Sequence, residues 1–150
     1  MSEDFLRLIP AEPFFLPTES AQQEAVAYLK SLAPDADSID ARVFDDIRFV
    51  DSGSNLEKVT CPLCGKDLTE VYGDLIDEAF LHVPARLDAS MPCCGGSTSL
   101  NALRFDWPAG FARFVLEARN AGIGGALDGA CLSALEKILG CPLRQVLAHY

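Results

Sequence analysis

The stretch CPLCGK at residues 61–66 decides how the rest of this chain is interpreted, and MPCCGG follows it at residues 91–96. A gap of two residues lets two thiolates converge on one ion, and a glycine after the second cysteine can adopt the positive φ that turns backbone N–H groups toward sulfur. Four sulfurs suit Zn²⁺, which accepts tetrahedral thiolate coordination. The sequence therefore predicts a zinc-knuckle-like site. Its expected ligands are Cys61, Cys64, Cys93 and Cys94.

The second cysteine turn is irregular when the two turns are overlaid on their prolines and glycines. The overlay pairs Pro62 with Pro92, Cys64 with Cys94 and Gly65 with Gly95. Met91 then falls at the place of Cys61, whereas the additional cysteine, Cys93, falls at the place of Leu63. Two alternatives for the fourth ligand stay open: Cys93 reached by a distorted turn, or His82 from the segment between the turns.

The metal is expected to be structural. Four thiolates, or three thiolates and one imidazole, leave no open coordination position for the water that a catalytic zinc needs. Reduced thiols in turns and a redox CxxC motif are the alternatives, but a redox motif normally opens a helix after a strand. A disulfide between the adjacent Cys93 and Cys94 would be strained. The other cysteines, Cys131 and Cys141, are predicted to be core or half-buried thiols.

Length and charge narrow the possible classes of protein. The chain has 150 residues and a hydrophobic content of 49%, which predicts one domain over residues 1–150 with a substantial core. Its 22 acidic and 12 basic residues give a net charge of -10, which repels phosphate backbones and anionic lipid headgroups. We therefore expect no nucleic-acid partner and no membrane. The start, MSEDFLRLIP, lacks the pattern of a signal peptide, which predicts a cytoplasmic protein.

Hydrophobic periodicity predicts strands interspersed with about four helices. The helices are expected at residues 19–33 with Thr18 or Ser20 as the cap, from the cap Thr69 to residue 80, at residues 106–118, and from the cap Asp128 to residue 139. An extended segment is expected over residues 4–17, a hairpin over residues 41–50 and 57–60, and a further strand over residues 98–105. Because strands and helices do not alternate regularly, the sequence predicts an α+β domain with a small mixed or antiparallel sheet.

Few other residues form a recognisable catalytic pattern. His149 lies next to the last residue and is expected to face solvent, and no G-x-S-x-G turn accompanies it. Gly122–Gly125 resembles a phosphate loop only in its glycine content, because it lacks the Lys-Ser/Thr pair and a preceding strand. It is predicted to connect two helices.

An acidic group and an aromatic group are predicted to lie on the surface and in the core, respectively. Asp74, Asp77 and Glu78 share one helix face at a spacing that could hold Mg²⁺, but a solvated acidic face is expected. Three aromatic residues are predicted to lie on the buried stripe of a helix, namely Trp107, Phe111 and Phe114. An exposed member of this group would indicate a surface that binds a partner.

Several motifs together resemble a family of small, stand-alone bacterial proteins that are functionally uncharacterised. The motifs are CPLCG, PCCGGSTSLNALRFDWPAGFARFVLEARN and LEKILGCPLRQVLAHY, preceded by FFLPT and VFDDIRFVDSG. The resemblance covers most of the chain. It implies a cytoplasmic bacterial protein with paired, zinc-ribbon-like cysteines, and it implies no enzyme activity or substrate.

The function expected from these observations is that of a zinc-stabilised protein-interaction module. Its partner is expected to be a protein with a basic surface, because a net charge of -10 would accelerate that association. One concrete version is an immunity or antitoxin-type protein. The alternative is a metal-dependent or thiol enzyme, in which Cys93 or Cys94 is a free nucleophile beside a three-ligand zinc.

Overall fold

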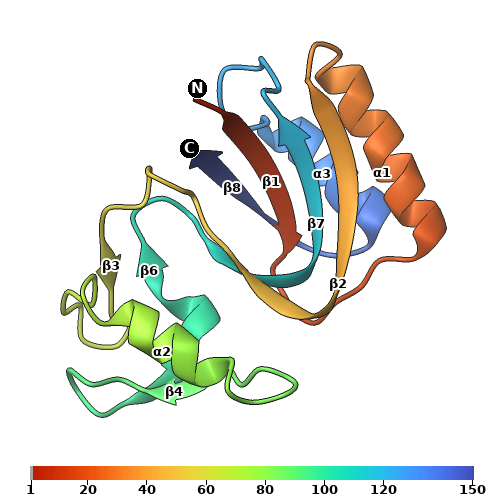
Figure 1. Ribbon diagram of the computed structural model, residues 1–150. Coiled ribbons are helices and arrows are strands. Elements are labelled where there is room, and N and C mark those ends of the chain that lie inside the picture. Colours follow the sequence, from red (N-terminus) through yellow and green to blue (C-terminus); the bar gives the residue numbers. More distant parts are fainter. Residues whose placement is uncertain (1) are drawn as a thin grey trace.

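The computed structural model describes residues 2–150, which form a four-stranded antiparallel sheet, two helices on one face of it, and a lobe inserted into the chain (Figure 1). The strands of the sheet are β1 (Asp4–Pro10), β2 (Ser38–Val50), β7 (Gly110–Arg119) and β8 (Leu143–His149). The helices are α1 (Glu19–Leu32) and α3 (Gly129–Leu139). Residues 51–109, between β2 and β7, are called the inserted lobe. Within residues 2–150, no helix is long and apolar enough to cross a membrane.

The strand order of the sheet is β2-β7-β1-β8, and every neighbouring pair is antiparallel. α1 connects β1 to β2, and α3 connects β7 to β8. Apart from the inserted lobe, the order along the chain is therefore β-α-β-β-α-β, which is the ferredoxin-like arrangement. The predicted α+β class with a small antiparallel sheet is confirmed.

Both long helices begin at capping residues that the sequence predicts. Thr18 caps α1, and its side chain accepts a hydrogen bond from the N–H of Ala21. Asp128 caps α3 by accepting from the N–H of Cys131, and Gly140 ends this helix in the left-handed conformation with a φ of 80°. The apolar faces of the helices pack on alternate residues of the strands. Buried members of this core are Leu6, Leu8, Leu29, Phe114, Leu116 and Leu135.

The inserted lobe contains two small sheets, one α-helix and one short 3-10 helix. Its elements are β3 (Val59–Thr60), α2 (Tyr72–Ala79), β4 (Asp88–Ser90), β5 (Ser97–Ser99), the 3-10 helix η1 (Leu100–Ala102) and β6 (Arg104–Phe105). β3 pairs with β6, and β4 pairs with β5. Ile47 of β2 and Phe111 of β7 are buried in the core of the lobe. The carboxylate of Asp46 also accepts from the N–H of Ala85 at 2.8 Å, so apolar and polar contacts join the lobe to the sheet.

The helix predicted at residues 106–118 is wrong, because this segment forms the central strand β7. Both faces of β7 are buried: Phe114 packs against the helices, whereas Val115 packs with Ile9 on the opposite face. A strand that is buried on both faces has a nearly continuous apolar sequence, and its residues can match helical spacing by coincidence. Residues 2–150 accordingly contain three α-helices and the short η1, not the four expected.

Smaller expectations about local structure also need correction. The segments 41–50 and 57–60 do not form a hairpin, because β2 pairs with β7 and β3 pairs with β6. The strand expected at residues 98–105 is interrupted by η1. Thr69 does not cap α2; its hydroxyl accepts from the N–H of Val59 instead. The glycine-rich loop after residue 120 connects a strand, β7, to a helix, α3.

Candidate metal centre

The two cysteine turns share the same backbone hydrogen bonds. In the first turn, the N–H of Gly65 donates to the carbonyl of Cys61, and the N–H of Cys61 donates to the carbonyl of Lys66. In the second turn, the N–H of Gly95 donates to the carbonyl of Met91, and the N–H of Met91 donates to the carbonyl of Gly96. All four N···O distances are 2.8–2.9 Å. Gly65 and Gly95 have φ values of 77° and 73°, which favour glycine. The overlay of the turns is therefore confirmed, and Cys93 reaches the cluster from a second turn with the same hydrogen bonds as the first.

Four sulfur atoms gather between the two turns. The Sγ atoms of Cys61, Cys64, Cys93 and Cys94 all lie within 4.8 Å of one another. The Sγ atoms of Cys64 and Cys93 are 3.3 Å apart. Cys61 is buried, Cys93 is half-buried, and Cys64 and Cys94 are exposed. The cluster therefore extends from the core of the lobe to its surface, and it could hold a metal ion.

Cys93 enters the cluster from the position that Leu63 occupies in the first turn. Leu63 itself lies over Gly96. A Cβ atom on Gly96 would be only 2.6 Å from the Cδ1 atom of Leu63. Met91 takes the position equivalent to Cys61, is 1% exposed, and packs in the core of the lobe. In the second turn, the residue at the first position, Met91, therefore packs in the core. The residue at the third position, Cys93, supplies the thiol that Cys61 supplies in the first turn.

His82 lies apart from the four cysteines. It lines a separate hollow of about 310 Å³ between α2 and β4, together with Glu78, Arg86 and Asp88. Of the two alternatives for the fourth group, the structure therefore brings Cys93 to the other three thiols.

The thiols of the cluster differ in acidity. Burial by itself raises the pKa of Cys61, but N–H donors of Leu63 and Cys64 and the neighbouring thiols outweigh it and lower this pKa to about 7. At Cys93, burial is the largest influence and raises the pKa. Hydrogen bonds with the other thiols add to this effect and bring the pKa of Cys93 to about 12. Thiolates this close together repel one another. A bound cation would offset this repulsion and favour the deprotonated form of all four thiols.

The remaining two cysteines lie outside the cluster, as predicted. Cys131 is half-buried and Cys141 is buried. Burial, and secondarily the charge of Glu136, raise the pKa of Cys141 to about 11. A thiol in such surroundings is unreactive at neutral pH.

Two exposed apolar features were missed by the sequence reasoning. Trp107, expected on a buried stripe, is 42% exposed. Leu81 and Val83 are 81% and 91% exposed in the loop that follows α2. The signal for this loop was the apolar run FLHVP at residues 80–84, which continues past the end of the helix to a proline.

Known proteins offer no guide to the role of this centre. No family model, curated protein or solved structure matches the chain. The resemblance to bacterial proteins with paired cysteines therefore stays a prediction, as do the compartment and the partner.

Proposed function

We propose that the protein is a zinc-stabilised module that binds a protein partner through its inserted lobe. The proposed ligands of Zn²⁺ are Cys61, Cys64, Cys93 and Cys94. Tetrahedral zinc with Zn–S bonds of about 2.3 Å places its sulfur atoms about 3.8 Å apart. The sulfurs of the cluster lie within 4.8 Å of one another, with one pair at 3.3 Å, so small side-chain adjustments would suffice. Four protein ligands leave no position for water, and the ion would stabilise the lobe.

The observation that carries the interaction proposal is the exposed loop at residues 80–83, which we call the apolar loop. Leu81 and Val83 are the most exposed of the large hydrophobic residues in the described chain, at 81% and 91%, and Phe80 beside them is 36% exposed. Isolated exposed hydrophobic residues are common, but adjacent ones on a single loop are typical of a binding surface. A partner that covered this loop would remove its apolar area from water.

Acidic groups lie next to the apolar loop. Asp74, Asp77 and Glu78 of α2 are exposed, in agreement with the acidic face expected from their spacing. Four thiolates around Zn²⁺ would add a formal charge of about -2 to the same lobe. These charges favour a partner that surrounds an apolar patch with lysine or arginine, and they would accelerate its association at low salt.

Leu81→Asp is expected to abolish partner binding while leaving the fold intact. A photo-reactive benzoylphenylalanine at position 83 should form one discrete adduct in cells that produce the protein naturally. Leu81→Asp should lower the yield of this adduct roughly tenfold or more, since it places a charge at the centre of the contact. The matched control is Val43→Asp, because Val43 of β2 is 48% exposed and lies outside the lobe.

The stability of both variants should stay within about 0.5 kcal/mol of the wild type, since both positions are exposed. An adduct that survives Leu81→Asp, or that forms equally well with the photo-reactive residue at position 43, would contradict the proposed surface.

A second candidate function is a metal-dependent or thiol enzyme, and the exposure of Cys94 is the observation that favours it. In that case Cys93 or Cys94 would be free beside a three-ligand zinc, and brief alkylation of the zinc-loaded protein should modify this thiol selectively. A structural site predicts the opposite, because zinc would protect all four thiols while Cys131, half-buried and outside the cluster, reacts first. Mass spectrometry of the alkylated protein distinguishes the two candidates.

A further inference from the structure

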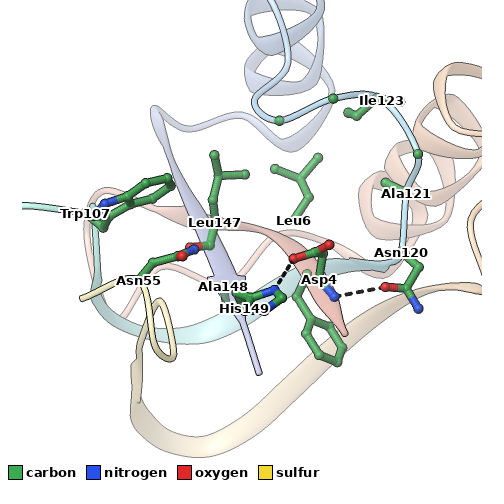
Figure 2. A pocket seen from close by; sticks show the side chains of 14 residues that line it. Asp4, Leu6, Asn55, Trp107, Asn120, Ala121, Ile123, Leu147, Ala148 and His149 are labelled. Carbon is green, nitrogen blue, oxygen red and sulfur yellow. Dashed lines mark hydrogen bonds and ion pairs between the residues drawn. The ribbon is translucent and has the colours of Figure 1, made fainter. Parts of the chain in front are cut away.

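A hollow of about 560 Å³ opens where β1 begins and β8 ends (Figure 2). Its walls come from the ends of these strands, from the loop at residues 120–125 after β7, and from Asn55 and Trp107 of the inserted lobe. This volume is within the range of small-ligand pockets. The described residues that line it include none of the four clustered cysteines and no part of the apolar loop.

The walls of this hollow are largely apolar. In Figure 2, the side chains of Leu6 and Leu147 lie between the ring of Trp107 on one side and Ile123 on the other. Trp107 is 42% exposed. The hollow thus offers a partly exposed indole ring beside aliphatic side chains, a combination suited to a ligand with an apolar body.

Asp4 supplies the negative charge of this hollow. Its Oδ1 lies 2.6 Å from Nδ1 of His149, and 74% of the Asp4 side chain remains exposed. Lysine and arginine are absent from its lining in the part of the chain that the structure describes. The backbone carrying Asp4 is held in place, because its N–H donates to Oδ1 of Asn120 at 2.9 Å and its carbonyl accepts from the N–H of Asn120 at 2.7 Å.

The face of the sheet opposite the helices differs in charge. A hollow of about 510 Å³ lies there, lined by several arginines. Arg7 and Arg42 both pair with Glu117, at 2.9 and 3.3 Å, and Arg119 pairs with Glu3 at 2.9 Å. Because three of the four arginines in this lining are paired with carboxylates of the same chain, we assign no ligand to that face.

The glycine-rich loop does not make the first hollow an anion site. The loop does follow a strand and precede α3, as phosphate-binding loops do. However, the N-terminus of α3 is occupied by the carboxylate of Asp128, which accepts from the N–H of Cys131 at 2.8 Å. Asp4 would also repel a phosphate at close range.

We propose that this hollow, which we call the Asp4–Trp107 pocket, binds an organic cation: a guanidinium or primary ammonium group on an apolar chain. The cationic group pairs with the Asp4 carboxylate. Its apolar chain extends from there toward the indole of Trp107, which lies beyond Leu147 in Figure 2. Its methylene groups contact Leu6 and Leu147. The net charge of -10 raises the local concentration of such ligands. The group belongs to a free small molecule or to an arginine or lysine of a protein chain.

The experiment uses the intrinsic fluorescence of the full-length, metal-loaded protein, because Trp107 is its only tryptophan. Butylguanidinium should produce a saturable change, and butylurea, a neutral molecule of the same shape, should bind roughly tenfold more weakly. Acetyl-Leu-Arg-amide distinguishes the two sources. Tighter binding of this peptide than of butylguanidinium assigns the cation to a protein chain, and the reverse order assigns it to a free small molecule.

Two variants complete the test. Asp4→Asn should weaken the binding of butylguanidinium about fivefold, the upper end for an exposed ion pair. Asp35→Asn, at an exposed acidic residue outside the pocket, should leave it unchanged. Two results with the wild-type protein alone would overturn the proposal. One is equal binding of butylurea and butylguanidinium, and the other is the absence of a saturable change with any of the three probes. Unaltered affinity in a folded Asp4→Asn protein would do the same.

Discussion

Purified Cys61→Ser protein should contain no zinc, whereas the wild type should contain one zinc per chain. Cys61 is 0% exposed and lies in the core of the inserted lobe, so this change removes a proposed ligand and leaves a buried hydroxyl. In small zinc-binding peptides at pH 7, the binding of structural zinc contributes an apparent free energy of folding of roughly 10–16 kcal/mol. Even a loss of about 4 kcal/mol should lower the melting temperature by about 10 °C in a domain of this size.

Elemental analysis and scanning calorimetry on protein purified without added metal or chelator would measure both effects. Cys131→Ser is the matched control, because Cys131 is half-buried and outside the cluster; this variant should retain its zinc. His82→Ala should retain its zinc as well, since His82 lines the hollow between α2 and β4 and is not part of the cysteine cluster. Zinc-free wild type, or stoichiometric zinc in Cys61→Ser, would refute the proposed site. Zinc lost from His82→Ala would make His82 a ligand after all.

The parts of the structure that could be predicted from the sequence are those set by neighbouring residues. The hydroxyl of Thr18 and the carboxylate of Asp128 cap their helices within three residues, and Gly140 ends α3 through its own φ. The two cysteine turns are equally local, because each is closed by hydrogen bonds within six residues, 61–66 and 91–96. Signals of this range are contained in the sequence itself.

The topology could not be predicted, because it depends on pairings between distant segments. β7 has buried residues on both faces, so its sequence lacks the alternation that identifies a half-exposed strand. With β7 interpreted as a helix, the partners of β1 and β2 were missing, and the β-α-β-β-α-β order could not be recognised. The choice between Cys93 and His82 had the same origin, since it required the position of α2 relative to the second turn.

Exposure is the other property that the pattern could not supply. The spacing of Trp107 and Phe114 suggested one buried stripe, yet Trp107 precedes β7 and is 42% exposed, whereas Phe114 is fully buried. Similarly, Leu81 and Val83 continue the apolar composition of α2 but lie beyond its last residue. Composition alone does not distinguish a core from a binding surface. Both proposed binding surfaces therefore depend on the structure.

Phe111→Ala should cost about 3–5 kcal/mol of the free energy of unfolding and should weaken the inserted lobe in particular. Phe111 of β7 is fully buried in the core of the lobe, with its ring centroid 5.2 Å from that of Phe49 and 6.3 Å from that of Phe80. Hydrogen exchange should accelerate across residues 59–105, and a chelator should remove zinc faster, because the packing that joins the lobe to the sheet is lost.

Phe114→Ala is the matched control, since Phe114 lies on the same strand and is equally buried, but in the core beneath the helices. It should cost a similar free energy and leave zinc release unchanged. If residues 106–118 were helical, Phe111 and Phe114 would share one face, and the two losses would couple. In β7 they belong to separate cores, so the double variant should be additive within about 0.5 kcal/mol. A coupling energy above about 1 kcal/mol would contradict the strand and, with it, the separation of the lobe core from the helix-covered core.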